Sequence, residues 1–305
     1  MRAAHETQQP QPAAHETQSS VEDSPRAVAL GTGHEAEVLG FLSARPVHTV
    51  YMAGLIRDNG LVARENRGAF YGCRGERGRL EGVALVGHVT QVEARSDCAR
   101  RALARAAQCC SSAHVIMGEQ ERIRAFWEHY AEARQPARLA CRELLCVKTW
   151  PLDAVGADAP ELRPATPTDL PLVAPAQAGM AFEECGVNPL EVDPAGFRER
   201  CARRIRRGRV WVAVGADGLL DFKADVMAET PEAAYLEGVY VRPGARGRGL
   251  GRRCTLRLCR ELLARSRAVC LLVNERNLGA QSFYHKLGFR FGGLYETIYL
   301  HKTLA

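Results

Sequence analysis

The stretch VYVRPGARGRGLGRRC, Val239–Cys254, is the feature that most constrains the fold of this 305-residue chain. A strand-like apolar run ends at Pro243, a segment rich in glycine and arginine follows, and a helix-like pattern begins at Leu250. Glycines between a strand and a helix leave backbone N–H groups open, and the first turn of the helix adds unpaired amides and a favourable dipole. The segment is therefore predicted to bind an anion.

Two other phosphate-binding motifs do not match this segment. A P-loop places Lys and then Ser or Thr after its last glycine, whereas Arg252 and Arg253 follow Gly251. The dinucleotide fingerprint GxGxxG carries an acidic residue about twenty positions later, whereas the glycines here alternate from Gly247. Downstream, apolar residues recur every four positions on one face of the predicted helix: Leu250, Cys254, Leu258 and Leu262. The segment is thus a loop fixed at the start of a packed helix.

The chain shows the same order of predicted elements twice: strand, two helices, three strands, helix, strand, helix and strand. The first series occupies residues 26–150 and the second residues 161–305, which end on a predicted pair of strands in RFGGLYETIYLHK. Residues 151–160 interrupt the periodicity and are predicted to be a linker. Residues 1–25 are polar, contain AAHETQ twice, and are predicted to be a disordered tail. The order of elements predicts two related domains in tandem.

Composition restricts the classes of function. Hydrophobic residues make up 46% and charged residues 25%, as in a soluble globular protein. No apolar run approaches the roughly 20 residues that span a bilayer, and the N-terminus lacks the pattern of a secretory signal. We therefore expect a cytoplasmic protein with no membrane partner. The 11 cysteines form no paired CxxC units, which disfavours a metal site or a disulfide framework. A net charge of +6 permits anion binding but does not indicate nucleic acid. A homodimer is left open.

The second series resembles the GNAT superfamily of N-acetyltransferases. The central signature of that family, Arg/Gln-x-x-Gly-x-Gly/Ala after the fourth strand, is matched by Arg246, Gly249 and Gly251. YLEGVYVRP resembles the fourth strand of the family and AVCLLVN the fifth. NLGAQSFYHKLGFR resembles the segment usually written as Asn, spacer, Ala, Phe-Tyr, Lys-x-Gly-Phe. Together these matches span about residues 161–304.

This resemblance implies an α/β (α+β) fold with two tandem GNAT-like domains, each a mixed, mostly antiparallel sheet flanked by helices. The fourth and fifth strands of the C-terminal domain would splay to admit acetyl-CoA as a co-substrate, without a metal, while the loop grips its pyrophosphate. The cofactor-binding residues implied are Val239, Tyr240, Val241, Arg246, Gly247, Arg248, Gly249, Leu250, Gly251, Arg252 and Asn277.

The first series resembles, more loosely, the poorly characterised domain that precedes such a module in some bacterial predicted acetyltransferases. Its counterpart of the loop, RSDCARR, contains no glycine, and Asp97 is the predicted N-cap of the next helix. We therefore expect a degenerate GNAT-like domain that no longer binds the cofactor. It would form a wall of the acceptor cleft, a docking surface or a fold stabiliser.

Two side chains are candidates for catalysis. The resemblance implies that Tyr284 is the acid that protonates the leaving thiolate; the alternative is a core tyrosine on an apolar helix stripe whose N-cap is Asn277. Glu237 is the candidate base, and strand alternation predicts that it shares a face with Val239 and Val241; the alternative is a solvated or salt-bridged glutamate. Backbone N–H groups of the same strand would stabilise the oxyanion.

The implied reaction is direct transfer of an acetyl group from acetyl-CoA to a primary amine, of a small molecule or a protein, in a ternary complex. Glu183 and Glu184 could attract a cationic amine, although exposed acidic pairs are usually solvated. Four arginines cluster on one predicted helix, as a solvent-facing surface or as a site for an anionic acceptor or RNA-bound protein: Arg203, Arg204, Arg206 and Arg207. The alternative function is a non-catalytic module that senses acyl-CoA or binds a partner.

Overall fold

The computed structural model describes residues 26–131, 136–150 and 158–301, so the predicted tail and most of the predicted linker lie outside the described residues. The first series of elements is β1 (Ala27–Ala29), α1 (Glu35–Leu42), α2 (Pro46–Asn59), β2 (Gly68–Arg74), β3 (Leu80–Gly87), β4 (Val89–Ala94), α3 (Asp97–Gln108), β5 (Val115–Glu119), α4 (Gln120–Ala131) and β6 (Ala137–Thr149). The second series is β7 (Arg163–Pro164), α5 (Leu170–Cys185), α6 (Pro189–Val192), α7 (Pro194–Arg206), β8 (Val210–Val214), β9 (Leu220–Glu229), β10 (Ala234–Val241), α8 (Leu250–Leu263), β11 (Ala268–Asn274), α9 (Leu278–Lys286) and β12 (Arg290–Leu300). The predicted order is present in both halves; within the described residues, the short helix α6 and four 3₁₀ turns are additional.

One predicted element is wrong. The segment RFGGLYETIYLHK forms the single strand β12 rather than a pair of strands. Its two glycines do not make a hairpin turn, because the register of β12 on β6 only shifts between Phe291 and Gly293, as at a bulge. The strand then continues with a neighbour on each side, β5 and β6, so it has no free edge on which to fold back.

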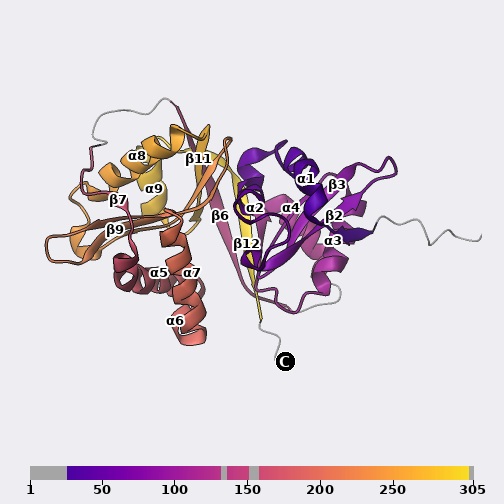
Figure 1. The fold of residues 1–305 in the computed structure, drawn as a ribbon, viewed down its shortest axis with the longest axis horizontal. Coiled ribbons are helices and arrows are strands. Elements are labelled where there is room, and N and C mark those ends of the chain that lie inside the picture. The colour runs from indigo at the N-terminus through magenta and orange to yellow at the C-terminus, as the bar shows by residue number, and fades with distance from the viewer. Residues whose placement is uncertain (1–25, 132–135, 151–157, 302–305) are drawn as a thin grey trace, which may run out of the picture.

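All described strands form one 12-stranded sheet, in the order β1-β2-β3-β4-β5-β12-β6-β11-β10-β9-β8-β7. In Figure 1, β6 and β12 run side by side between the two lobes of the molecule. β6 closes the first series but pairs with β11 of the second, and β12 closes the second series but pairs with β5 of the first. The two halves therefore exchange their last strands. The exact domain boundaries at 26–150 and 161–305 stay a prediction.

Helix α2 also connects the two halves, because it packs on strands of the second half. Val50 of α2 packs in one cluster with Ala228 of β9, Tyr235 of β10 and Cys270 of β11, so a helix of the first half covers strands of the second.

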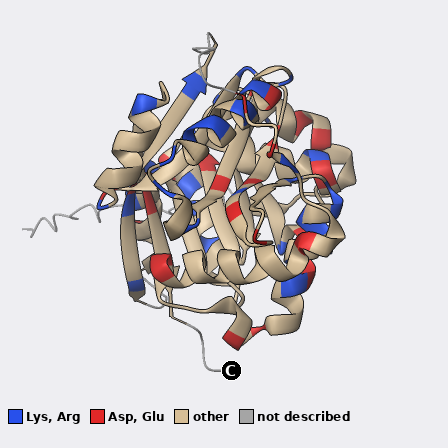
Figure 2. Ribbon diagram, turned by 90° about the vertical axis from the view of Figure 1, so that its left-hand side faces the viewer, with Lys and Arg blue, Asp and Glu red and all other residues tan. Residues whose placement is uncertain are grey.

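Charged residues of both signs occur along helices and strands (Figure 2). Across the described ranges, no helix combines the length and apolarity needed to cross a membrane. All 11 cysteines are free thiols.

The packing of α2 on β9 can be tested at Gly54. A Cβ there would lie 2.7 Å from the Cβ and 3.2 Å from the Cα of Ala228. Gly54→Ala should lower the free energy of unfolding by about 1–2 kcal/mol, because strand backbone cannot move aside. In α1, a Cβ at Gly40 would meet nothing within 4 Å, so Gly40→Ala should raise the same free energy by about 0.5–1 kcal/mol. Urea unfolding measures both, and shifts of the same sign and size would contradict the close contact.

Candidate active site

The two parallel strands in the centre of the second half separate from each other. β10 pairs with β11 only over Ala234–Leu236, although it continues to Val241. This register confirms the splay predicted between the fourth and fifth strands. Beyond Leu236, the edge of β10 that faces β11 has no strand partner among the described residues. The carbonyls of Gly238 and Val241 accept from the side chains of Lys223 and Arg246, and the other backbone polar groups of this edge are available to another molecule.

A β-bulge lies at the point of separation. The register of β10 on β9 slips between Glu237 and Tyr240, so that Gly238 and Val239 together face one residue of β9. Gly238 has a φ of 60°, in the left-handed region that glycine adopts at little cost. A Cβ there would also lie 2.9 Å from Nζ of Lys223. The bulge therefore requires glycine.

Lys223, which sequence reasoning missed, is fully buried on β9 and fixes this bulge. Its Nζ donates to the Gly238 carbonyl at 3.2 Å and to the side-chain oxygen of Gln177 on α5 at 2.5 Å, and it pairs with the Asp225 carboxylate at 2.8 Å. Burial lowers the pKa of Lys223, and Asp225 opposes that effect. A buried ammonium is costly unless it is paired and hydrogen-bonded. These three contacts meet that need and hold the bulge in place.

The bulge corrects the prediction that Glu237 shares a face with Val239 and Val241. Both valines pack with Leu236 against the core under α8. Glu237 instead lies on the other side of the sheet, where it interacts with the charge of Arg204 on α7. The reason is physical: the extra residue of a bulge shifts the alternation of side chains by one position.

The loop after β10 forms an open turn. Pro243–Ala245 is a single 3₁₀ turn, and Gly247 and Gly249 both have a φ of 76°. α8 begins at Leu250, so the N–H groups of its first turn have no acceptor within the helix. Left-handed glycines next to a helix N-terminus form a concave row of amides that suits an anion.

Gly251 contributes close packing to this loop. A Cβ at Gly251 would lie 3.0 Å from the side chain of Val241 and 3.6 Å from the ring of Phe283. Its missing side chain lets the start of α8 approach β10 and α9. Sequence reasoning assigned the glycine to the cofactor and did not foresee this steric role.

The side chains of the predicted cofactor residues are mostly exposed. Arg246, Arg248 and Arg252 lie at the surface around the turn, and Nε of Arg246 donates to the Val241 carbonyl at 3.0 Å. Asn277 caps α9 by accepting from the amide of residue 280 at 3.0 Å, which confirms its predicted capping role. Exposed guanidinium groups beside an open turn can add charge-assisted bonds to an anion.

Three carboxylates from three elements interact near the bulge: Glu237 on β10, Glu184 on α5 and Glu143 on β6. Glu143 lies opposite Asn274, the last residue of β11, and accepts a hydrogen bond from the Thr297 hydroxyl at 2.5 Å. Sequence reasoning missed Glu143, because only the strand exchange brings β6 to this place.

Two of these carboxylates have pKa values near neutrality. Burial, and then the charge of Glu184, raise the pKa of Glu237 to about 7. Burial also raises the pKa of Glu143 to about 7, against the Thr297 hydrogen bond. Glu184 accepts a hydrogen bond from the Tyr299 hydroxyl at 3.1 Å. A carboxyl group poised near pH 7 can accept or release a proton under physiological conditions.

Tyr284 lies on the other side of the sheet from Glu237, in the core under α8 and α9. Its ring makes edge contacts with Phe283 and Phe289, with centroids 5.2 and 5.5 Å away. Burial, and then two neighbouring cysteine thiols, raise the pKa of Tyr284 above its ordinary value. The phenol therefore stays protonated at neutral pH, and it is a hydrogen-bond donor.

Comparisons with known proteins bear on this fold and site. The family model described as FR47-like protein matches residues 223–297, which include Lys223, Glu237, the loop and Tyr284. No curated protein gives a significant match. A Drosophila protein of known structure superposes with a TM-score of 0.66 at 12% identity, over 91% of this chain and 99% of that one.

Two further solved structures carry GNAT descriptions. A tandem GNAT protein from the clavulanic acid biosynthesis pathway gives a TM-score of 0.58 at 16% identity, over 92% of this chain and 99% of that one. A GNAT-family acetyltransferase from Colwellia psychrerythraea gives 0.52 at 12% identity, over 90% of this chain and all of that one (100%). At these identities the likeness establishes the fold. This chain has a tandem GNAT fold, which confirms at that level the resemblance found in its sequence.

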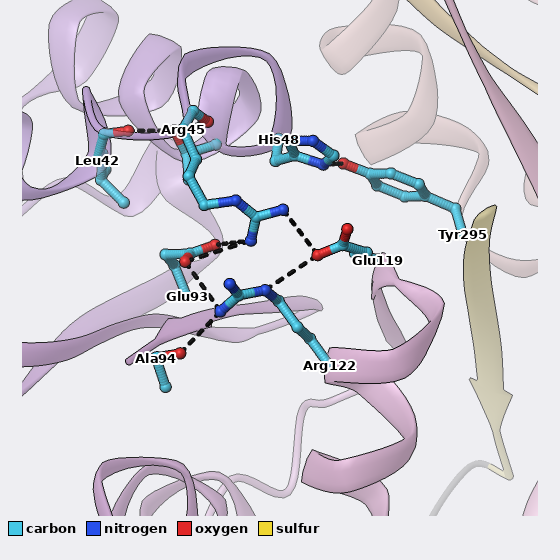
Figure 3. A network of polar contacts seen from close by, with 9 residues as sticks. Leu42, Arg45, His48, Glu93, Ala94, Glu119, Arg122 and Tyr295 are labelled. Atoms are coloured by element: carbon cyan, nitrogen blue, oxygen red, sulfur yellow. Dashed lines mark hydrogen bonds and ion pairs between the residues drawn. The ribbon is translucent and has the colours of Figure 1, made fainter. Parts of the chain in front are cut away.

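The corresponding opening in the first half is bridged by charge (Figure 3). β4 and β5 pair at two positions and then separate. Beyond them, Arg45, the N-cap residue of α2, pairs with Glu93 of β4 at 3.1 Å and with Glu119 of β5 at 2.7 Å. Arg122 of α4 pairs with the same two carboxylates at 3.0 and 2.9 Å. Side chains thus join the strands where the second half leaves a gap.

The loop between β4 and α3 is also different in the first half. Arg95 and Ser96 alone connect the strand to the helix. Ser96 is the N-cap, since its hydroxyl accepts from the amide of Ala99 at 3.3 Å, and Asp97 is the first helical residue. The prediction that Asp97 caps α3 is therefore wrong by one position. A hydroxyl occupies the helix N-terminus, and the glycine turn has no counterpart here.

The charge network of Figure 3 should be a measurable part of stability. The Glu93 side chain is 9% exposed and serves two guanidinium groups. Glu93→Gln should lower the free energy of unfolding by about 2–3 kcal/mol, because it leaves both arginines short of a counter-charge. Glu37→Gln, which breaks the exposed pair with Arg74, should cost at most about 0.5 kcal/mol. Guanidinium chloride unfolding measures the difference, and equal costs would contradict a supporting role for the network.

Proposed function

We propose that the second half of the chain is an acetyl-CoA-dependent N-acetyltransferase that acts on a primary amine by direct transfer in a ternary complex. The observation that carries this proposal is the separation of β10 from β11, with a glycine turn suited to an anion at one end and a carboxyl group of near-neutral pKa at the bulge. The tandem GNAT fold supports the same function. A cytoplasmic location and an active second half alone are part of the proposal.

The residues around the gap fit acetyl-CoA, which supplies an activated acyl group as a thioester. The amides of Gly247–Arg252 would hold the diphosphate, and Arg246 and Arg248 would add charge-assisted bonds. The open edge of β10 at Val239–Val241 would bind the pantetheine arm and offer N–H groups to the carbonyl oxygen as it gains charge. Asn277 would contact the same ligand in addition to capping α9.

Glu237 would act as the base. An amine acceptor arrives mostly as an ammonium group, which has no lone pair for attack. A carboxylate with a pKa of about 7 is substantially ionised at neutral pH and can remove that proton. The freed lone pair forms the new N–C bond as the C–S bond breaks, and sulfur leaves with the bonding electrons. The second proton lost by nitrogen balances the charge on sulfur, so the products are an amide and a thiol.

Tyr284 would serve the leaving sulfur as a hydrogen-bond donor. A thiol has an ordinary pKa near 8.5, well below that of a phenol, and burial raises the pKa of Tyr284 further. Complete transfer of the phenolic proton to the thiolate is therefore uphill. A donated hydrogen bond still stabilises the thiolate as it forms.

The same burial favours a second candidate function, a non-catalytic module that senses acyl-CoA or holds a partner. Tyr284 packs among the aromatic rings of Phe283 and Phe289, as a purely structural residue also would. In that case the glycine turn would bind the nucleotide without a reaction at Glu237. Binding and turnover must therefore be measured separately.

Binding is tested first at Gly249. Gly249→Asp places a negative charge in the glycine turn and should weaken acetyl-CoA binding at least about tenfold, because the carboxylate repels a diphosphate. Gly78 is a matched control, since it has a φ of 71° and open space around it in the turn between β2 and β3. Gly78→Asp should bear the same backbone strain and bind acetyl-CoA as the wild type does. Calorimetric titration gives both affinities, and unchanged binding in Gly249→Asp would sink the proposal.

Turnover is tested by its pH dependence. Thiol release in the presence of an amine acceptor should rise through about pH 7 as Glu237 ionises. Glu237→Gln should remove this rise and lower kcat/KM by about 10²–10⁴-fold. Glu143→Gln removes the other carboxyl group with a pKa of about 7 and should leave the rise in place. A pH limb that disappears in Glu143→Gln and persists in Glu237→Gln would exclude Glu237 as the base.

Unfolding cannot account for such a loss. Burial holds the folded-state pKa of Glu237 above its ordinary value of 4.5, so the folded protein loses stability as the pH rises from that value through about 7. Glutamine removes this loss, and Glu237→Gln should be at least as stable as the wild type at pH 8. If acetyl-CoA binds but thiol release never exceeds background, and neither Glu237→Gln nor Tyr284→Phe changes it, the sensing module is favoured instead.

A further inference from the structure

A pocket of about 130 Å³ lies at the seam between the two halves, where α2 meets α7 and β9. Six arginines line it: Arg67, Arg200, Arg203, Arg204, Arg207 and Arg209. Among the described residues, two carboxylates face them, Asp58 and Glu65. The lining includes no residue of the glycine turn or of α8, so this pocket is distinct from the site suited to a diphosphate.

Carboxylates pair with only some of the arginines in this arginine pocket. Arg209 pairs with Asp58 and with Glu229, both at 3.0 Å, and Arg200 pairs with Asp193 at 2.9 Å. By contrast, within residues 26–131, 136–150 and 158–301, Arg67 and Arg203 make no ion pair or side-chain hydrogen bond. Burial and then the like charge of Arg200 lower the pKa of Arg67, Arg203 adds to the lowering, and Tyr51 and the Asp193 carboxylate oppose it. Such crowding of like charge is relieved when an anion binds.

Arg204 holds unused hydrogen-bonding capacity at the inner end of the arginine pocket. Its terminal nitrogens donate to the sulfur atoms of Cys201 at 3.6 Å and Met227 at 3.7 Å, which are weak acceptors. Its Nε lies 3.5 Å from the Asp225 carboxylate and is buried without a hydrogen-bond partner among the described residues. A guanidinium group so placed can still take a stronger oxygen acceptor.

Arg67 occupies an unusual backbone position at the mouth of the arginine pocket. With a φ of 53°, it is the one non-glycine residue in the described ranges that has a positive φ. Arg67 ends the 3₁₀ turn Arg64–Asn66, and its carbonyl lies 2.2 Å from where a Cβ of Gly87 would be, so the strand can pass this close only because residue 87 is glycine. The left-handed region is unfavourable for a long side chain, and such strain clusters at binding sites. Glycine or asparagine would serve better if the position were merely a turn.

The arginine pocket adjoins the proposed base. Tyr51 lines it, and the pKa of Tyr51 is raised to about 12 by burial and then by the charge of Glu237. Arg204 lines it as well and leads through Asp225 to Lys223, which holds the bulge beside Glu237. Glu237 itself is not part of the pocket lining, so an acceptor that contacts both the arginines and Glu237 must reach past Tyr51 and Arg204.

We propose that the arginine pocket holds an anionic group, a carboxylate or a phosphate, of the amine that accepts the acyl group. Planar guanidinium forks match both anions in geometry and charge. The opposite end of such an acceptor is an ammonium group. The carboxyl groups of Glu237 and Glu184 would attract that positive charge. The inference rests on the proposed function and adds the substrate class: an amine that carries both charges, with its anion at the seam and its nitrogen at the bulge.

Direct binding of the anion is tested without an acyl donor. Inorganic phosphate and acetate are titrated into the full chain at constant ionic strength by calorimetry, which also tells the two anions apart. Arg203→Gln and Arg67→Gly, the latter compatible with a φ of 53°, should weaken the better anion at least about fivefold, as loss of a charged hydrogen-bond partner does. Arg206→Gln is the control, because Arg206 lies on the same helix but pairs with Glu199 at 2.5 Å. No binding of either anion at millimolar concentration, or equal weakening by the control, would overturn the inference.

Acceptor selection is tested with acetyl-CoA and matched amines. Thiol release is compared for glycine, β-alanine and 4-aminobutyrate against their amides, and for phosphoethanolamine against ethanolamine. At least one charged member should exceed its neutral partner about tenfold or more in kcat/KM, through charge-assisted pairing. Arg203→Gln should reduce that ratio toward one, and Arg206→Gln should retain it. Neutral members that react as well as charged ones, or a ratio unchanged in Arg203→Gln, would overturn the inference.

The two proposals fail in different ways. If acetyl-CoA does not bind the wild type, the proposed function falls, and the pocket is then no acceptor site even if phosphate binds there. If acetyl-CoA binds through the turn at Gly249 and thiol is released, but neither Arg203→Gln nor Arg67→Gly alters anion binding or acceptor preference, the arginine pocket alone loses its assigned role.

Discussion

The pairing of β6 with β12 is the contact on which the rest of the molecule depends. It runs from Arg290 opposite Val147 to Leu300 opposite Ala137, and it turns two sheets into one. Because β6 also pairs with β11, it carries Glu143 to the end of that strand. The same connection places α2 over strands of the second half, and α2 supplies one wall of the arginine pocket. A tandem of two self-contained sheets would have neither feature.

The buried ammonium group of Lys223 determines the arrangement of the candidate site. Lys223 holds the bulge at Gly238, and the bulge turns Glu237 away from the two valines that follow it. The carboxyl group therefore faces α5 and α7, whereas Tyr284 lies beneath α8. The proposed base and the proposed hydrogen-bond donor thus lie on opposite faces of the sheet. The proposed function requires a thioester in the gap between β10 and β11 to contact both.

The parts of this structure that depend on local sequence were predictable, and those that depend on distant partners were not. Helical and strand periodicity predicted the element order, and the glycine turn before Leu250 was found from its own residues. The strand exchange could not be predicted, because nothing in the sequence of β6 specifies that its neighbour lies more than a hundred residues later. The bulge left one signal, a glycine inside a strand at position 238. Sequence analysis grouped Arg204 with the other arginines of its helix, and its contacts with Asp225 and Met227 of β9 distinguish it from the exposed Arg206.

The exchanged strands also set the order in which the chain can become complete during synthesis. The first half cannot finish its own sheet, because the neighbour of β5 is β12, at residues 290–300. Until the ribosome has released that strand, β5 presents an open edge, and β6 lacks one of its two partners, β11 and β12. Open edges recruit strands from other chains, so the nascent protein is most exposed to misassembly while its second half is being made. Protection by a chaperone would matter most in that interval.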